Sequence, residues 1–187
     1  MIRRVPVLPT VIVAAAIAVM IALGVWQLGR MHQKEALLER YRAARTMTVE
    51  APFSADSLYR RSRVECLRVI EASTMAGING KGESGQAHIA RCALPGGGEA
   101  LVVLGWSRDL AMGDWRGGEV VGWVAPGPRL VADPPLAGLE ANAIPDPSSI
   151  PNNHWSYAIQ WFLFAGVALV IYVLALRKRL AAGAQPG

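Results

Sequence analysis

The sequence predicts a membrane protein of the α+β class, in which two transmembrane helices flank a small antiparallel β-rich extracytoplasmic domain. Two apolar stretches, residues 10–28 and 157–176, contain no charged side chain. At about 1.5 Å per residue, a helix of twenty residues is about 30 Å long, which is the thickness of a hydrocarbon core. Between the two stretches, short runs rich in Val, Leu, Ile and Trp alternate with Gly and Pro clusters, a pattern typical of β-strands.

The N-terminal part is predicted to contain a basic cytoplasmic leader (residues 1–9), a transmembrane helix (10–28) and a helical extension (29–45). A cleaved signal peptide is the alternative, but the polar end of the apolar run offers a poor cleavage site, which favours an uncleaved anchor. Ala14, Ala18 and Ala22 recur every four residues. They form either a small-residue face for another helix or the ordinary alanine content of such helices.

Residues 46–132 are predicted to form the β-rich domain. Strands are expected at residues 47–50, 63–70, 87–94, 101–106, 119–124 and 130–132. Residues 77–85 superficially resemble a phosphate-binding loop, but Gly82 rather than Ser or Thr follows Lys81. We therefore expect a flexible loop between strands in this region.

Residues 133–153 contain five prolines and can form neither a regular helix nor a central strand. They are predicted to be an extended strap that returns the chain to the membrane. The second transmembrane helix is expected at residues 154–176, followed by a basic cytoplasmic tail at residues 177–187.

The net charge of +5 comes from the membrane flanks. Five basic residues lie outside the region between the spans: Arg3, Arg4, Arg177, Lys178 and Arg179. The region between the spans contains 14 basic and 14 acidic residues and is therefore neutral. Nucleic acid is not expected as a partner, because its binding requires Lys and Arg clustered on a folded domain. The cations that follow the second span place both termini in the cytoplasm and the central domain outside it.

Cys66 and Cys92 are the two cysteines of the chain, and each falls in a predicted strand. They are either a disulfide between neighbouring strands, favoured by an oxidising compartment, or two buried thiols. Their spacing fits neither a redox Cys-x-x-Cys motif nor a zinc site. An extracytoplasmic enzyme is disfavoured, because no nucleophile set or metal cluster is recognisable.

Residues 152–162 (Asn-Asn-His-Trp-Ser-Tyr-Ala-Ile-Gln-Trp-Phe) open the second span and carry the most distinctive chemistry. One helix face is predicted to contain His154, Tyr157, Ala158, Trp161 and Ala165. Imidazole is a standard axial ligand of haem iron, and the alanines would leave space for a flat macrocycle lined by Tyr157 and Trp161. The alternative is an aromatic belt in which His154 caps the helix or contacts lipid headgroups.

Four segments together resemble a known family. Residues 24–30 (Gly-Val-Trp-Gln-Leu-Gly-Arg) leave the first span and residues 152–162 open the second, while Leu-Gly-Trp at 104–106 and Gly-Trp-Val at 122–124 lie at strand ends. This combination resembles the surfeit-locus (Surf-type) family of cytochrome c oxidase assembly proteins. The resemblance covers the whole span–domain–span arrangement.

The resemblance implies a non-catalytic assembly protein of the bacterial inner membrane with a periplasmic central domain. It would assist insertion or stabilisation of haem a in cytochrome c oxidase subunit I, with haem a synthase and membrane lipid as further partners. His154 matches a histidine to which haem a binding is assigned in bacterial members, which makes it the candidate iron ligand. Trp26, Gln27 and Arg30 form a helix-pair motif, which suggests that the first helix partners the second. The alternative is a cofactor-free membrane scaffold that clamps a nascent oxidase subunit.

Overall fold

A computed structural model describes residues 6–111 and 113–182 of the chain. The chain forms two compact units, one made of Met1–Leu37 with Pro151–Gly187 and the other of Leu38–Ile150. The first unit contains most of helix α1 (Val7–Arg45) and all of helix α2 (His154–Ala182), and the second contains a six-stranded sheet. Two long apolar helices thus flank a β-domain, which confirms the predicted fold class.

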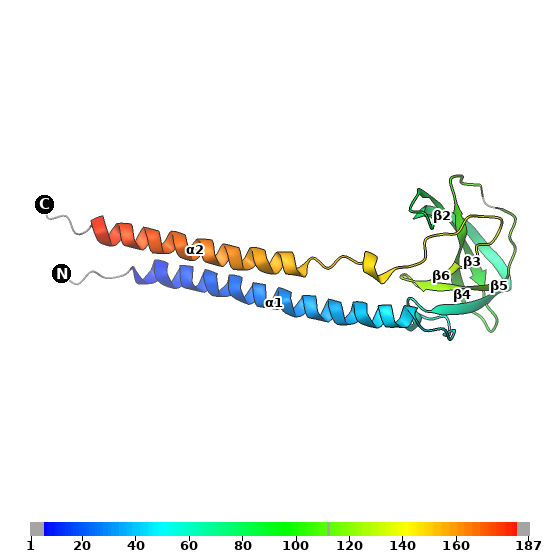
Figure 1. Cartoon of the computed structure of the whole chain (residues 1–187), viewed down its shortest axis with the longest axis horizontal. Coiled ribbons are helices and arrows are strands. Elements are labelled where there is room, and N and C mark those ends of the chain that lie inside the picture. Colours follow the sequence, from blue (N-terminus) through cyan, green and yellow to red (C-terminus); the bar gives the residue numbers. More distant parts are fainter. Residues whose placement is uncertain (1–5, 112, 183–187) are drawn as a thin grey trace. The chain divides into compact units, whose positions relative to one another are not determined.

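Helices α1 and α2 lie side by side and run antiparallel within the first unit (Figure 1). Their least exposed positions recur at alternating spacings of three and four, as in a coiled-coil seam. The seam contains Thr10, Val13, Ile17, Met20, Gly24 and Gln27 of α1, and His154, Ala158, Trp161, Ala165, Ala168 and Tyr172 of α2.

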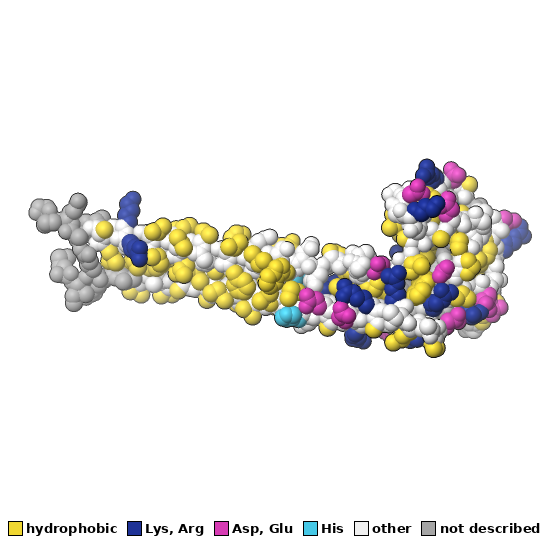
Figure 2. Space-filling view, viewed as in Figure 1, with side chains coloured by type: hydrophobic (Ala, Val, Ile, Leu, Met, Phe, Trp, Pro, Cys, Tyr) yellow, Lys and Arg dark blue, Asp and Glu magenta, His cyan; other side chains and the backbone are white. Residues whose placement is uncertain are grey.

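Outside the seam, the surface of the apolar stretch of each helix is exposed. Only 6% of the most apolar stretch of each helix is buried, whereas the core helix of a soluble protein is mostly buried. Hydrophobic side chains cover the visible face of the apolar stretches of both helices, whereas charged side chains appear along the C-terminal part of α1 and near the C-terminal end of α2 (Figure 2). The two helices are therefore suited in length and composition to crossing a membrane.

The small-residue stripe of α1 does not contact α2. Ala14, Ala18 and Ala22 are all exposed, and the residue that brings the helices together is Gly24, the one buried residue in the span. A Cβ at Gly24 would lie 2.6 Å from Cε1 of Phe162. The polar partners along the seam, Thr10 and Gln27, select this face because each bonds to a side chain of α2.

The sheet of the second unit has the strand order β1-β5-β6-β4-β3-β2. Its strands are β1 (Arg61–Cys66), β2 (Arg68–Ile78), β3 (Ser84–Ala93), β4 (Glu99–Ser107), β5 (Gly118–Ala125) and β6 (Arg129–Ala132). Neighbouring strands are antiparallel except β4 and β6, which are parallel. The domain predicted to be antiparallel is therefore a mixed sheet with one parallel pair, because the β5–β6 hairpin inserts its second strand between β5 and β4.

Leu67 divides the strand predicted at residues 63–70 into two. Ser62, Val64 and Cys66 of β1 are buried in alternation, and the alternation ends after Leu67, because Leu67 and Arg68 are both exposed. Since β1 and β2 are opposite edges of the sheet and one residue joins them, the sheet must curl back on itself. The Cys66–Cys92 disulfide, with 5.1 Å between the two Cα atoms, joins β1 to β3 across this curl.

The strand predicted at residues 47–50 is not formed. The chain there is irregular and makes an isolated parallel bridge between Ala51 and Ser62, where the Ser62 hydroxyl also donates to Ala51 O (2.7 Å). Glu50 Oε2 accepts a hydrogen bond from Nε of the Arg63 guanidinium (3.0 Å). The segment therefore covers the outer edge of β1 without extending the sheet.

The main core lies against one face of the curled sheet. Its fully buried members include Ala90, Val102, Leu104, Val124 and Leu130. Side chains from connecting segments cover them: Phe53, Leu58, Trp115, Leu136 and Leu139. The last turns of α1 also belong to this unit, since Leu38 is buried and the Tyr41 ring lies 4.8 Å from that of Tyr59.

The proline-rich strap belongs to the sheet unit as far as Ile150. Trp106 and Glu140 exchange two backbone hydrogen bonds of 2.7 and 3.0 Å, and Ala143 N donates to Ile78 O at the outer edge of β2. The Trp106 indole is 1% exposed and donates to Gly77 O. Trp106 is therefore a core residue at the end of β4, where the strap covers the sheet.

The segment expected to be a flexible loop at residues 77–85 is largely ordered by strand pairing and by Asn79. Strand β2 continues to Ile78 and β3 begins at Ser84. Asn79 is 2% exposed, its Oδ1 accepts from the N–H groups of Lys81 and Glu83 (both 2.9 Å), and its Nδ2 donates to Glu83 Oε2. The Asn79 side chain supplies hydrogen-bond partners that the backbone of a short turn lacks. The many glycines of this segment had suggested flexibility instead.

We expect Gly85→Ala to destabilise the sheet unit by about 2 kcal/mol, as overpacking of a filled core does. A Cβ at Gly85 would lie 2.4 Å from Cζ2 of Trp106, a buried ring that cannot move aside. Gly80→Ala is the matched control, because a Cβ there meets nothing within 4 Å. Denaturant unfolding followed by Trp fluorescence measures the difference, and equal losses in the two variants would contradict this packing.

Stability should also fall in acid through Asp146. The Ser148 N–H donates to Asp146 Oδ1 (2.8 Å), and this bond, with the cation of Arg45 3.3 Å away, lowers the pKa of the carboxyl. A lowered folded-state pKa stabilises above the unfolded value of about 4 and loses that contribution as the pH falls through the folded value. Asp146→Asn keeps the acceptor for Ser148, so its melting temperature should fall less than that of the wild type between about pH 5 and pH 3. Parallel melting curves would exclude this role.

Candidate functional site

His154 is the first residue of α2, and its ring is tied to α1. The Nδ1 atom lies 2.8 Å from Oε1 of Gln27. Both side chains are half-buried on the seam between the two helices. The backbone N–H of Tyr157 donates to Asn153 O, so the helix begins directly at this ring.

This hydrogen bond selects one tautomer of the imidazole. Because a carboxamide oxygen only accepts, Nδ1 carries the proton and donates it to Gln27. The neutral ring then keeps its lone pair on Nε2. Nε2 makes no hydrogen bond to any residue that the structure describes. An imidazole held through Nδ1 with Nε2 free is the arrangement of metal-ligating histidines.

Small residues surround the seam below His154. Ala158 and Ala165, one and three turns along α2, are 0% and 5% exposed. Gly24 of α1 lies against the Phe162 ring. The backbones of the two helices therefore approach closely on the side of the histidine that faces the apolar stretch.

The structure separates the two aromatic residues expected to share a face with His154. Trp161 lies on the seam, half-buried, with its ring 6.2 Å from that of Phe164 in an edge-to-face arrangement. Tyr157 is 51% exposed and turns away from α1. Three residues advance a helix by about 300°, so Tyr157 stands about 60° around the helix from His154, whereas Trp161 stands only about 20° away.

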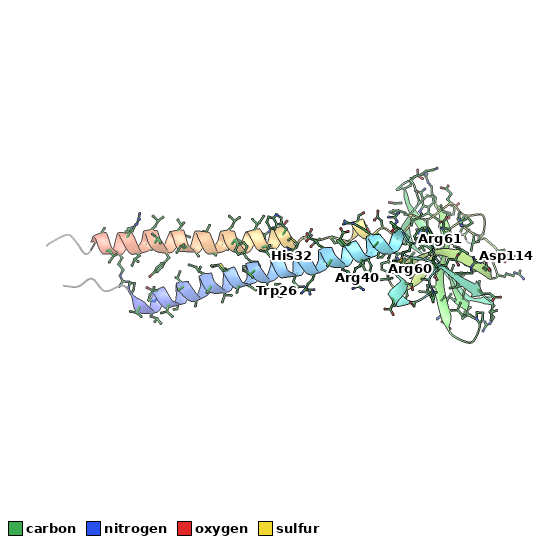
Figure 3. The ribbon with its side chains drawn as sticks, turned by 60° about the horizontal axis from the view of Figure 1, so that its bottom comes forward. Trp26, His32, Arg40, Arg60, Arg61 and Asp114 are labelled. Carbon is green, nitrogen blue, oxygen red and sulfur yellow. A yellow bond between two sulfur atoms is a disulfide. The ribbon has the colours of Figure 1, made fainter. Side chains whose placement is uncertain are left out.

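The helix-pair motif of α1 is divided in the same way. Gln27 faces α2, while Trp26 is 57% exposed on the outer side of α1 (Figure 3). Arg30 is exposed and donates to Oε1 of Gln33 (2.9 Å) within the same helix. Of the three motif residues, only Gln27 is brought to His154.

Two hydrogen bonds mark the ends of the apolar part of the helix pair. At the other end from Gln27 and His154, the hydroxyls of Thr10 and Tyr172 lie 2.5 Å apart. The eighteen residues from Thr10 to Gln27 correspond to about 27 Å of helix, close to the thickness of a hydrocarbon core. Trp26, Trp155 and Tyr157 are exposed at the level of His154, where aromatic side chains meet a membrane boundary.

Sequence reasoning missed two functional features of this unit. The Asn152 Oδ1 atom is buried and has no hydrogen-bond partner among the described residues. In the sequence, Asn152 stands out only through its position two residues before His154. The Thr10–Tyr172 pair was also missed, although polar residues in apolar runs are the ones that must find partners.

The other candidate residues lie in the sheet unit and do not form a second site of this kind. Cys66 and Cys92 form a disulfide. His88 is fully buried in β3, with Nε2 2.8 Å from the Ser107 hydroxyl. Across residues 6–111 and 113–182, no three His, Cys, Asp or Glu side chains are grouped so that they could hold a metal ion.

The sequence matches a known protein family. A family model described as the SURF1 family matches residues 14–166, which is more than half of the chain and includes both Gln27 and His154. No curated protein matches the sequence.

The interhelical hydrogen bond should be measurable by a double-mutant cycle. Gln27→Ala, His154→Ala and the double variant are expected to give a coupling free energy of about 0.6 kcal/mol, the average for such bonds in membranes. Loss of the fold in mixed detergent–SDS micelles provides the measurement. In a parallel cycle, Gln33→Ala with His154→Ala should show no coupling, because Gln33 bonds within α1. Additive losses for Gln27 and His154 would contradict the contact.

Proposed function

Since the chain belongs to the SURF1 family, which is associated with cytochrome oxidase assembly, we propose that it holds haem a and assists its insertion or stabilisation in oxidase subunit I. The observation that carries this proposal is the Nδ1–Gln27 bond of His154, which leaves Nε2 free to ligate. Haem a is cargo in this scheme, and when bound it supplies an iron that accepts an axial imidazole.

The residues around His154 fit a macrocycle. The donor is an imidazole whose orientation is fixed by Gln27 and which is half-exposed, so a group outside the helix pair can reach it. The neighbouring seam positions Gly24 and Ala158 are buried by close packing of the two helices, so they support the imidazole and do not provide the space for the ring. The orphaned Asn152 Oδ1 supplies an acceptor for a hydroxyl or other donor group at the polar rim. The apolar helix surface just below this level suits the ring and its hydrocarbon substituent.

Each residue then has a distinct role. His154 binds the iron, and Gln27 fixes the orientation and tautomer of the imidazole through the Nδ1 hydrogen bond. Trp161 lines the apolar side of the site. Tyr157, which is turned outward, and Trp26 anchor the helices in the lipid headgroup region.

The proposed mechanism is binding and positioning without covalent chemistry. The family is an assembly-factor family and is not known for an enzymatic activity. Its role in oxidase assembly suggests a partner among the oxidase subunits, and we propose subunit I, with haem a synthase as donor and membrane lipid as surroundings.

The helix pair and the family membership fit a membrane protein. We propose the bacterial inner membrane, with both termini cytoplasmic and the sheet unit periplasmic. Two observations support this orientation. Arg177, Lys178 and Arg179 follow the second span, as cytoplasmic flanks do. The Cys66–Cys92 disulfide suits an oxidising compartment.

Haem a titrated into the detergent-purified full chain tests the ligand. We expect the wild type to shift the haem absorption spectrum and His154→Ala to lose this shift. Gln27→Leu should weaken binding by about 10- to 100-fold, as loss of an outer-shell partner does. Acid should weaken binding in the wild type, because only the neutral imidazole ligates iron.

His32→Ala is the matched control. His32 is an exposed histidine of α1 a little beyond Gln27, and its removal should leave the spectrum unchanged (Figure 3). Wild-type affinity in His154→Ala would eliminate His154 as ligand. Co-purification of subunit I that survives His154→Ala, with no haem retained by either protein, would favour the cofactor-free scaffold instead.

A further inference from the structure

Strand β2 is one edge of the sheet, and its outer side is open along most of its length. Its inner side pairs with β3 from Arg68 to Ile78. The outer side receives two backbone contacts among the described residues. Val69 N donates to Arg116 O at one end, and Ile78 O accepts from Ala143 N at the other.

The direction of the backbone groups between these ends follows from the ladder. In an antiparallel strand, alternate residues direct both N–H and C=O to the same side. Ile78 directs its carbonyl outward to the strap. Ala76, Thr74 and Ala72 must therefore direct their N–H and C=O groups to the open edge as well. These three residues present a free ladder to an added strand.

The usable part of this edge is short and has a defined centre. A register shift between Val69 and Glu71 marks a bulge that ends regular pairing on one side. The strap contact at Ile78 ends it on the other side. The regular open stretch is therefore residues 71–77, and its midpoint is Thr74.

Between the bulge and the strap, this edge carries neither of the side-chain features that usually prevent pairing with another strand, a charge or a proline. Residues 72–77 (Ala-Ser-Thr-Met-Ala-Gly) contain no charged residue and no proline. The opposite edge of the sheet is different, because Ala51 bridges to Ser62 and Glu50 binds Arg63 over β1. The one acidic residue at the margin of the open stretch, Glu71, is already paired with Arg91 of β3.

We propose that the open edge of β2 pairs with β2 of a second copy of this chain, antiparallel and with Thr74 at the two-fold axis. In this register Thr74 faces Thr74, Ala72 faces Ala76, and Glu71 faces Gly77. The two free ladders satisfy each other with about six hydrogen bonds. The result is a continuous sheet across two protomers, and it is independent of the proposed haem function.

Three properties of the edge favour a second copy over an unrelated strand. The bulge and the strap bound the open stretch on both sides, and its midpoint, Thr74, is one of the residues with outward backbone groups, so a two-fold axis at Thr74 pairs every free group. No like charges oppose each other in that register, since Glu71 meets glycine. The facing side chains are small, and a central Thr–Thr pair is a favourable cross-strand pair.

Cysteine cross-linking in membranes containing the full chain tests the register. Two residues facing each other in a hydrogen-bonded antiparallel pair have Cα atoms about 5.5 Å apart, within the range of a disulfide. Thr74→Cys should therefore give a dimer band on a non-reducing gel after mild oxidation. Ser73→Cys is the matched control, because its two copies would be about 8 Å apart, too far to bond.

A charge experiment tests the same register without a covalent bond. Ala72 and Ala76 are exposed, so substitution there leaves each protomer folded. Ala72→Lys with Ala76→Lys places like charges opposite each other twice and should weaken the dimer by about tenfold. Ala72→Glu with Ala76→Lys places opposite charges there and should retain or strengthen it. Sedimentation in detergent measures both.

The proposal is overturned by a wild type that sediments as a monomer at concentrations where Thr74→Cys also fails to cross-link. It is equally overturned by Ser73→Cys cross-linking better than Thr74→Cys, which would place the axis elsewhere. Equal dimerisation of the Lys/Lys and Glu/Lys variants would exclude β2 as the interface. Haem binding should be the same in all these variants, which separates this result from the test of His154.

Discussion

Polar side chains on two apolar helices must find each other, and the helix unit depends on this constraint. A polar group left unpaired in hydrocarbon costs several kcal/mol. Gln27 with His154, and Thr10 with Tyr172, meet at opposite ends of the apolar stretch. Apolar packing alone would allow α1 and α2 to slide or rotate against each other, since most of their surfaces are interchangeable. The two hydrogen bonds fix rotation and register together.

The chemistry at His154 follows from this register. In the hydrogen bond that pairs the helices, Nδ1 is the donor, which leaves the lone pair of Nε2 available. One hydrogen bond therefore serves both the fold and the site. A carrier that hands its cargo onward needs such a ligand, positioned by the protein yet half-exposed. Gly24 and Ala158 are closely packed in this region, and the aromatic side chains exposed at the same level are of the kind found at membrane boundaries.

The sheet unit is organised by its curl. One exposed residue, Leu67, carries the chain from one edge of the sheet to the other, and the disulfide next to it holds β1 against β3. The strap then closes the opposite end through Trp106 and Ile78, using backbone groups that a flat sheet would expose. The two edges are treated differently, since a short segment covers β1 while β2 keeps three residues with outward backbone groups.

Local patterns in the sequence determined the two spans and most strands. About twenty apolar residues without a charge are typical of a membrane-spanning helix. Short β-rich runs bounded by Gly and Pro located β3, β4, β5 and β6 to within a few residues. The position of His154 at the start of α2 was also predictable, because the apolar run begins beside it. The association with oxidase assembly rested on motifs and not on residue physics.

Only the tertiary structure decided which segments meet. The break at Leu67, the parallel pairing of β4 with β6, and the order imposed by Asn79 each depend on partners distant in sequence or on side-chain contacts. The same holds for Gln27 as the partner of His154 and for Tyr157 turning outward, because helical periodicity gives relative angles but not the direction of the neighbouring helix. The sequence by itself determined where the chain is helical, extended or membrane-suited; the fold decided which polar atoms are satisfied and which remain free, because that depends on distance in space.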